Sequence, residues 1–169
     1  MTTSRTTLTR RSTRAGVLAL LTGAGLALTP LTARASAPGG GAVAPPAVVV
    51  APDAAAQKAV DTALAHLGNR YVWAGAGPDV FDCSGLTQFA YRAAGISLPH
   101  SSRLQSTAGR YVARADLRPG DLVFFYSPVG HVGMYLGNGL MVHAPTTGDV
   151  VKVVALDRMT GYNTARRVG

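Results

Sequence analysis

One cysteine and four histidines are the residues of this sequence best suited to nucleophilic chemistry. Cys83 is the only cysteine, so it cannot form a disulfide within the chain and is either a free thiol or an intermolecular link. A thiol nucleophile needs a base to take its proton and a third group to orient that base. The histidines available for these roles are His66, His100, His131 and His143.

Cys83 follows an aspartate that suits the start of a helix. An Asp82 side chain can cap the first turn, and Cys83 would then lie at the helix N-terminus. The partial positive charge and free N–H groups there favour a thiolate, so we expect the pKa of the Cys83 thiol to be lowered. Cys83 also lies one turn before Leu86 on the core-facing stripe, where a small buried hydrophobic residue fits equally well. Spacing alone leaves both interpretations open.

His131 and His143 are the histidines that a sheet would bring together. His131 begins a predicted strand after Gly130, and His143 ends the next predicted strand. Adjacent antiparallel strands would place the two side chains within reach, although two ordinary strand-end histidines also fit. We expect His66 to be solvated on the polar side of the first helix. His100 follows a proline in a loop, and the sequence does not decide whether it faces the site.

Cys83, His131 and His143 would also be chemically acceptable zinc ligands. Their spacings of 48 and 12 residues match no short ligand motif, and the sequence contains no CxxC or HxxxH pair. We therefore expect no metal and no cofactor.

The elements that must position these residues change from helices to strands along the chain. Asp53 can cap a helix over 54–67 with Leu67 on its apolar stripe, a second helix begins near Asp82-Cys83 and ends before Gly95, and a third covers 101–108. After a turn at 118–121, short strands are predicted over 122–126, 131–136, 140–143, 150–156 and 165–168. This order predicts an α+β fold, with N-terminal helices packed on an antiparallel sheet of about five strands.

The N-terminal segment is typical of an export signal. Residues 1–16 are cationic, residues 17–33 are mostly apolar, and Ala33-Arg34-Ala35 offers small residues to a signal peptidase. We expect a signal peptide over 1–35, with an uncleaved membrane anchor as the alternative. Residues 36–52 are dominated by Pro, Gly and Ala, which predicts a linker. The remaining 53–169 is long enough for one modest core.

The formal net charge of +8 lies mainly in that signal. Residues 1–35 contain five arginines and no acidic residue, whereas the rest of the chain carries a net charge of about +3. This modest charge, with no basic stripe, argues against a nucleic-acid partner.

Four blocks of the domain, in order, resemble the NlpC-type cell-wall peptidases. Residues 71–86 (YVWAGAGPDVFDCSGL) are similar to that family's nucleophile segment, and 117–125 (LRPGDLVFF) to its turn and first sheet strand. Residues 130–135 (GHVGMY) resemble its catalytic-histidine strand, and 142–144 (VHA) the segment with its third polar residue. The chain departs from the usual pattern at Ala74, where a glycine is common, and at His100, where an arginine is common.

The resemblance implies a papain-like fold and a secreted, extracellular or wall-associated enzyme that hydrolyses amide bonds in peptidoglycan stem peptides, often after γ-D-glutamate. By this resemblance, Cys83 is the nucleophile, His131 the base and His143 its orienting partner. Tyr71 and the Cys83 N–H would stabilise the oxyanion, while Asp82 and Ser84 would meet the free amine end of the stem peptide. We expect Trp73 to pack within the fold.

The resemblance leaves other functions to be tested. They are a thiol amidase acting on another γ-glutamyl or lipid amide, and a non-catalytic wall-binding module. We expect the protein to be a monomer whose partner is the stem peptide. After the signal is removed, we expect no stable insertion into a membrane.

Overall fold

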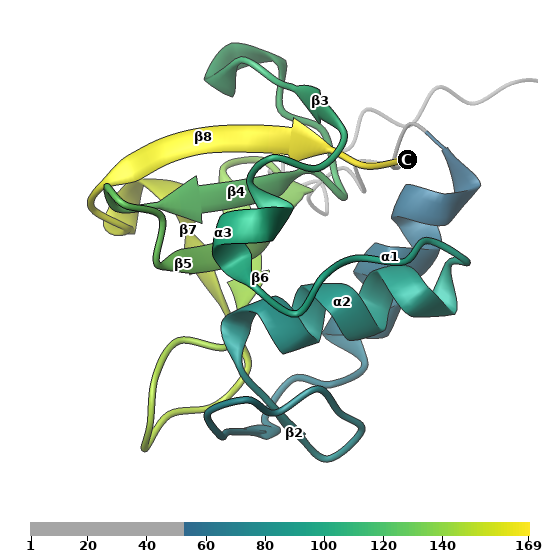
Figure 1. Ribbon diagram of the computed structural model, residues 1–169, viewed down its shortest axis with the longest axis vertical. Coiled ribbons are helices and arrows are strands. Elements are labelled where there is room, and N and C mark those ends of the chain that lie inside the picture. Colours follow the sequence, from purple (N-terminus) through teal and green to yellow (C-terminus); the bar gives the residue numbers. More distant parts are fainter. Residues whose placement is uncertain (1–52) are drawn as a thin grey trace, which may run out of the picture. The chain divides into compact units, whose positions relative to one another are not determined.

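The computed structural model describes residues 53–169 (Figure 1). The predicted signal peptide (1–35) and linker (36–52) lie outside the described residues. Within residues 53–169, no helix is long and apolar enough to cross a membrane.

Two helices form the first layer, close to where the sequence predicts them. Helix α1 spans Ala54–Leu64 and is capped by Asp53, whose carboxylate accepts from the Ala56 N–H at 2.7 Å. It ends three residues before the predicted boundary, and Leu67 is 46% exposed rather than part of the apolar stripe. Helix α2 spans Cys83–Ala93 as predicted and is capped by Asp82. The third helix, α3, is shorter than expected and spans Ser102–Gln105.

The second layer is a six-stranded antiparallel sheet, one strand larger than predicted. Its strands are β3 (Arg110–Tyr111), β4 (Leu122–Phe125), β5 (His131–Gly137), β6 (Leu140–His143), β7 (Lys152–Ala155) and β8 (Tyr162–Arg167). Their order is β3-β8-β4-β5-β6-β7, so four strands form the expected meander while the last strand returns beside β4. Short 3₁₀ turns cover Arg114–Asp116 and Leu156–Arg158. The predicted α+β fold is therefore confirmed.

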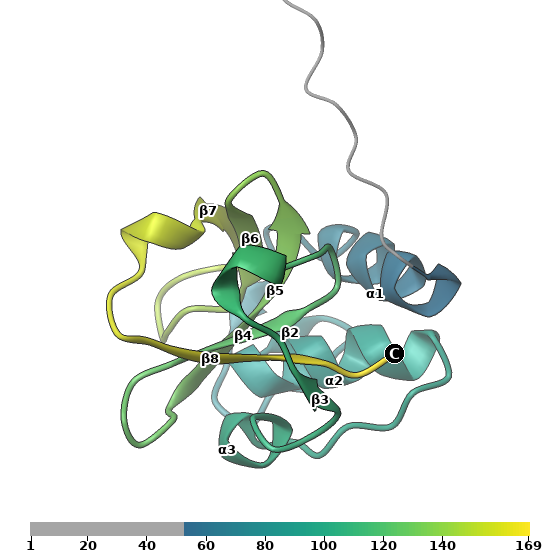
Figure 2. The same cartoon turned by 90° about the horizontal axis from the view of Figure 1, so that it is seen from above.

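Apolar side chains cover both faces of the sheet. Leu122, Phe124 and Val132 belong to the cluster that also contains the buried side chains of α1 and α2. Val123 and Phe125, at alternating positions of β4, belong to a second cluster away from the helices. Figures 1 and 2 show α1 and α2 side by side on one side of the sheet. The alternation follows from the period of a strand, whose successive side chains point to opposite faces.

A small parallel pair, β1 (Arg70–Tyr71) and β2 (Val80–Phe81), holds the segment just before α2. The Asp82 N–H donates to the Gly75 carbonyl at 2.8 Å, so the intervening loop folds back onto the start of the helix. A Cβ at Gly85 would lie 1.9 Å from that same carbonyl oxygen, which leaves room for glycine alone. This close contact fixes the loop beside the helix N-terminus.

A buried ion pair ties the turn before β4 to the last strand. Asp121 accepts from Arg167 through both carboxylate oxygens at 2.6 Å, and it also accepts from the Arg118 N–H at 2.7 Å. Tyr91 of α2 donates to the Gly120 carbonyl at 2.6 Å. Because the bidentate pair is fully hydrogen-bonded, it fixes the start of β4 relative to α2 and β8.

Candidate active site

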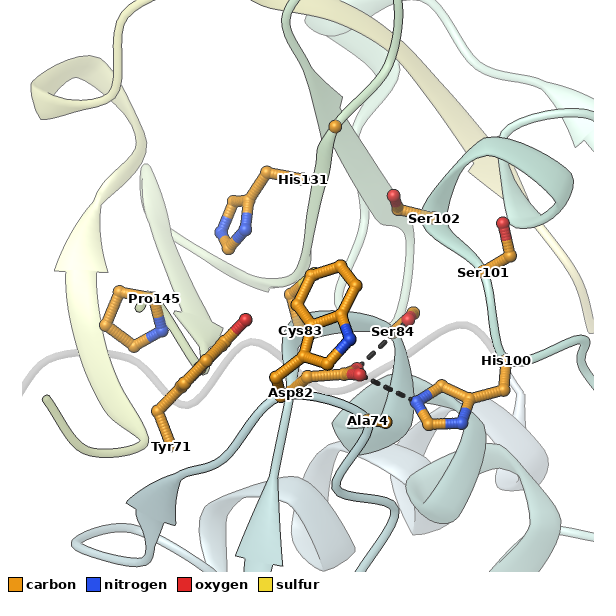
Figure 3. A pocket seen from close by; sticks show the side chains of 12 residues that line it. Tyr71, Ala74, Asp82, Cys83, Ser84, His100, Ser101, Ser102, His131 and Pro145 are labelled. Atoms are coloured by element: carbon orange, nitrogen blue, oxygen red, sulfur yellow. Dashed lines mark hydrogen bonds and ion pairs between the residues drawn. The ribbon is translucent and has the colours of Figure 1, made fainter. Parts of the chain in front are cut away.

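Cys83 is the first residue of α2 and lies on a pocket of about 290 Å³, which we call the thiol pocket. Its lining comes from the β1–β2 segment, the start of α2, the loop that leads into α3, the start of β5 and the loop after β6: Tyr71, Trp73, Ala74, Asp82, Cys83, Ser84, His100, Ser101, Ser102, Gly130, His131 and Pro145. All the residues that the sequence predicts for the site lie here except His143. Cys83 and His131 both line this common space, and Figure 3 shows the His131 ring pointing into it.

The ionisation of the thiol differs from the prediction. Burial raises the pKa of Cys83 above its ordinary value, with the Asp82 charge adding to the effect, while N–H groups of Val132, Ser84 and Cys83 itself oppose it. The predicted lowering of this pKa is therefore wrong, because removal of the sulfur from water outweighs the helix N-terminus. The resting side chain is a neutral thiol at neutral pH.

His131 and His143 are in direct contact, as the strand arrangement predicts. His131 Nε2 lies 2.9 Å from His143 Nδ1, and the two side chains are almost fully buried. Strands β5 and β6 pair with Met134 opposite Val142, which brings the start of one strand beside the end of the other. His131 Nδ1 is left as the ring nitrogen that can take a proton from a thiol.

Both imidazoles are held in the neutral form. Burial lowers the pKa of His131 from 6.5 to about 4, with a smaller contribution from His143. Burial followed by the Lys152 charge lowers the pKa of His143 to about 4, and Asp149 opposes this effect. A neutral His143 keeps a lone pair on Nδ1 when its other nitrogen carries the proton. It can then accept a hydrogen bond from the His131 Nε2–H.

Tyr71 and Trp73 have different surroundings, although only one residue separates them in the sequence. The Tyr71 hydroxyl is directed into the pocket beside Cys83 (Figure 3), and burial followed by the charges of Cys83 and Asp82 raises its pKa. It therefore remains a hydrogen-bond donor. Trp73 also lines the pocket but is 81% exposed, so the prediction that it packs within the fold is wrong. Ala74, next in the chain, has a φ of +60°.

Asp82 is both the cap of α2 and a polar wall of the pocket. Its Oδ1 accepts from the Gly85 N–H at 2.7 Å and from the Ser84 hydroxyl at 3.0 Å. Its Oδ2 lies 2.9 Å from His100 Nε2. His100 therefore faces the pocket, a question that the sequence left open. The predicted pair Asp82 and Ser84 is thus brought together beside Cys83 in the lining of the thiol pocket.

Gln105 positions this side of the pocket and has no obvious signal in the sequence. Its side chain is fully buried, and its amide donates to the carbonyls of Ser84 at 3.0 Å and Pro99 at 2.8 Å. Thr87 donates to its Oε1 at 2.7 Å. Gln105 therefore links the first turn of α2 to the loop that carries His100. A single polar residue in a short helix gives no periodic pattern from which this role could be predicted.

A second pocket, of about 500 Å³, meets the thiol pocket at Gly130, His131 and Pro145. We call it the basic pocket because Lys152 and Arg158 line it and no carboxylate residue does. Its remaining lining residues are Tyr126, His143, Thr146, Val154 and Met159. His131 thus lies between the two pockets, and His143 belongs to the second.

His66 is not part of either pocket, and it is not solvated as predicted. Its ring lies edge-on to Phe81 and Phe89, with 5.0 Å between centroids in each case. Packing of this half-buried ring against two aromatic rings accounts for His66, so we assign it no chemical role. In the part of the chain that the structure describes, no group of three or more His, Cys, Asp or Glu residues could hold a metal ion.

Comparisons with known proteins agree on one family. The sequence model of the NlpC/P60 family matches residues 68–167, more than half of the chain. A probable endopeptidase of Mycobacterium tuberculosis is 49% identical over 108 residues, covering 64% of this chain and 28% of that relative. The probable endopeptidase p60 of Listeria monocytogenes is 47% identical over 85 residues, covering 49% of this chain and 18% of the relative.

Solved structures give the same result. An NlpC/P60 family protein from Bacillus cereus is similar with a TM-score of 0.65 and 36% identity, over 70% of this chain and 41% of that one. The NlpC/p60 domain of the peptidoglycan hydrolase SagA has a TM-score of 0.62 and 33% identity, over 67% of this chain and 98% of that domain. The chain therefore belongs to the NlpC/P60 family, and it spans only part of the length of the endopeptidases that it matches.

Proposed function

We propose that this NlpC/P60 protein is a secreted cysteine endopeptidase that hydrolyses amide bonds in peptidoglycan stem peptides, after a γ-D-glutamyl residue. The observation that carries the proposal is the contact of 2.9 Å between His131 Nε2 and His143 Nδ1, at the edge of the pocket that holds the Cys83 thiol. The naming of similar proteins as endopeptidases, and of one as a peptidoglycan hydrolase, supports the substrate class.

The reaction begins with proton transfer from Cys83 to His131. Because the thiol is neutral at rest and the pKa of His131 is about 4, the base is free to accept the proton at Nδ1. The His131 ring that results is an imidazolium, and its Nε2–H donates to His143 Nδ1. This hydrogen bond supports the positive charge while it lasts. The thiolate forms as the sulfur attacks the scissile carbonyl carbon.

The tetrahedral oxyanion then needs donors in the same pocket. The N–H groups of the first turn of a helix have no acceptor within that helix, and the Cys83 N–H is one of them. The Tyr71 hydroxyl supplies a second donor beside the thiol. As the C–N bond breaks, the His131 imidazolium protonates the leaving amine. Water activated by His131 then hydrolyses the thioester and restores the thiol.

Asp82 and Ser84 would recognise the amine end of the acyl half of the substrate. Asp82 is buried and already accepts hydrogen bonds from Gly85 and Ser84. Its Oδ2, which lies 2.9 Å from His100 Nε2, is the oxygen that we assign to the substrate ammonium. A peptide whose ammonium group binds there would place its scissile carbonyl in the same pocket as Cys83. The wall location of the enzyme rests on the export signal proposed for residues 1–35.

Digestion of purified peptidoglycan by the protein, with mass analysis of the soluble products, tests the proposal. We expect fragments that end in γ-D-glutamate with the protein itself and none with Cys83→Ala. Equal fragments from the two proteins would contradict the cysteine mechanism. A parallel panel of γ-glutamyl and lipid amides tests the substrate, since cleavage of those compounds in place of peptidoglycan would identify a related thiol amidase instead.

A further inference from the structure

The mechanism described above places no part of the substrate in the basic pocket, although His131 and His143 line it. It shares Gly130, His131 and Pro145 with the thiol pocket. In the proposed reaction His131 protonates the leaving amine, so the part of the substrate that departs begins at this ring. The residues of the substrate beyond the scissile bond must therefore extend away from Cys83, and the basic pocket is the space on the far side of His131.

The charges of the two pockets have opposite signs. Asp82 is the carboxylate of the thiol pocket. Lys152 and Arg158 line the basic pocket, and Lys152 lies opposite His143 in the β6–β7 pair. A short peptide with a free ammonium end in the first pocket and a carboxylate beyond the scissile bond matches this arrangement in one orientation only.

The two cations differ in how far they are already neutralised. Lys152 Nζ forms an ion pair with Asp149 Oδ2 at 2.5 Å. Arg158 ends the second 3₁₀ turn and has no carboxylate partner among residues 53–169. A guanidinium binds a carboxylate through two parallel N–H donors, which gives it both affinity and orientation. Arg158 is therefore the stronger candidate for a charged ligand.

A buried polar atom on the wall of this pocket also lacks a partner. His143 is 3% exposed, and its Nε2 has no hydrogen-bond partner within the described part of the chain. When His143 Nδ1 accepts from His131, this Nε2 carries a proton. A buried N–H without an acceptor is costly, and a ligand oxygen in the adjoining pocket reduces that cost by adding negative potential beside it.

We propose that the basic pocket binds a free carboxylate of the leaving half of the substrate, and that the enzyme prefers acid over amidated stem peptides there. The inference rests on the proposed function and specifies the chemistry of the diamino acid that follows γ-D-glutamate. Arg158 and Lys152 are specificity-determining residues, with the larger effect at Arg158.

The test uses two synthetic peptides, L-Ala-γ-D-Glu-L-Lys and the same peptide with a C-terminal carboxamide. We expect kcat/KM to be about tenfold higher for the acid, since the amide loses the charge-assisted hydrogen bonds. Arg158→Gln should bring the ratio close to one, and Lys152→Gln should lower it less because Asp149 already neutralises that cation. Salt should reduce the preference in the unaltered protein.

Arg110→Gln is the matched control. It removes the same charge from β3, at the opposite edge of the sheet from β7, and should leave the ratio unchanged. Equal kcat/KM for the acid and the amide, or a preference that survives in the Arg158→Gln/Lys152→Gln double variant, would overturn the inference while leaving the peptidase intact. Absence of Cys83-dependent cleavage of both peptides would instead count against the proposed function itself.

Discussion

The thiol pocket and the basic pocket meet at His131 but are built in different ways. Half of the lining residues of the first come from one stretch of chain, residues 71–84, held by β1, β2 and the first turn of α2. The second is assembled from Tyr126, the end of β6, the start of β7 and the second 3₁₀ turn. The first contains the Cys83 thiol and the Asp82 carboxylate, and the second contains His143 and the two cations, Lys152 and Arg158.

In the proposed mechanism, the thiol pocket contains the groups that make and break bonds, and the basic pocket recognises the leaving group. The groups that touch the scissile carbonyl in this mechanism belong to the thiol pocket, whereas His143, which lines the basic pocket, acts through its contact with His131. Variants on the two sides should therefore have different kinetic signatures. The predictions below begin with the largest effect.

Removal of the nucleophile should have the largest effect. Cys83→Ala should reduce kcat/KM on a stem peptide by at least about 10⁴-fold, because the chain has no other thiol to form the acyl-enzyme. The thermal unfolding midpoint should stay close to that of the unaltered protein, since alanine fits the first turn of a helix. Retention of more than a few per cent of the activity would remove Cys83 from its proposed role.

Removal of the orienting histidine should have an intermediate effect. His143→Leu should lower kcat by about 10² to 10³-fold, because the imidazolium of His131 loses the acceptor for its Nε2–H. KM should change little if His143 acts only through His131. His143→Asn, which can offer an oxygen acceptor, should restore part of kcat. If the whole loss of kcat/KM in His143→Leu appears in KM, His143 acts in substrate binding. The two pockets would then not have separate functions.

Loss of the Tyr71 hydroxyl should have a smaller effect on the thiol pocket. Tyr71→Phe should reduce kcat by about 10²-fold, since one of two oxyanion donors is lost. Leu140→Ala, at the exposed start of β6, is a surface control at a residue that lines neither pocket. Unchanged kcat in Tyr71→Phe would show that the helix N–H groups stabilise the oxyanion without the phenol.

The state of the resting thiol can be measured without substrate. Because burial raises the pKa of Cys83 above its ordinary value of 9.0, the reactive thiolate is scarce at neutral pH and grows as pH rises. The rate of alkylation by iodoacetamide should therefore rise about tenfold between pH 7 and pH 8. His131→Ala should leave this slope unchanged. A rate that is already constant at pH 7 would indicate a preformed thiolate–imidazolium pair.

Substitution of Ala74 should have the smallest effect, and it should change stability rather than reaction rate. Its φ of +60° is in the left-handed region, which costs an L-residue about 1 kcal/mol or more. Ala74→Gly removes that cost but adds freedom to the unfolded chain, so we expect a net stabilisation of about 0.5 kcal/mol in urea unfolding. A clear loss of stability would mean that the Ala74 methyl group makes packing contacts that outweigh the backbone conformation.

The sequence predicted the thiol pocket better than the basic pocket, for a physical reason. Asp82, Cys83 and Ser84 are adjacent, and the cap that begins α2 has a local signal. The approach of His131 to His143 followed from two strands joined by a tight turn. Arg158 and Lys152 reach their pocket only through the pairing of β7 and the turn after it, which no short motif encodes. The raised pKa of Cys83 and the exposed Trp73 depend on the packed surroundings and could not be predicted from residue type.

The central claim is that Cys83 forms a covalent acyl-enzyme. It is tested most directly by adding hydroxylamine, which competes with water for the acyl group. If Cys83 forms a thioester after the amine leaves, hydrolysis of the acid and amide peptides passes through one common acyl-enzyme. The ratio of hydroxamate to carboxylate product should then be the same for both peptides, and Cys83→Ala should form neither product. A ratio that depends on the leaving group, or carboxylate product without any hydroxamate, would contradict the covalent mechanism.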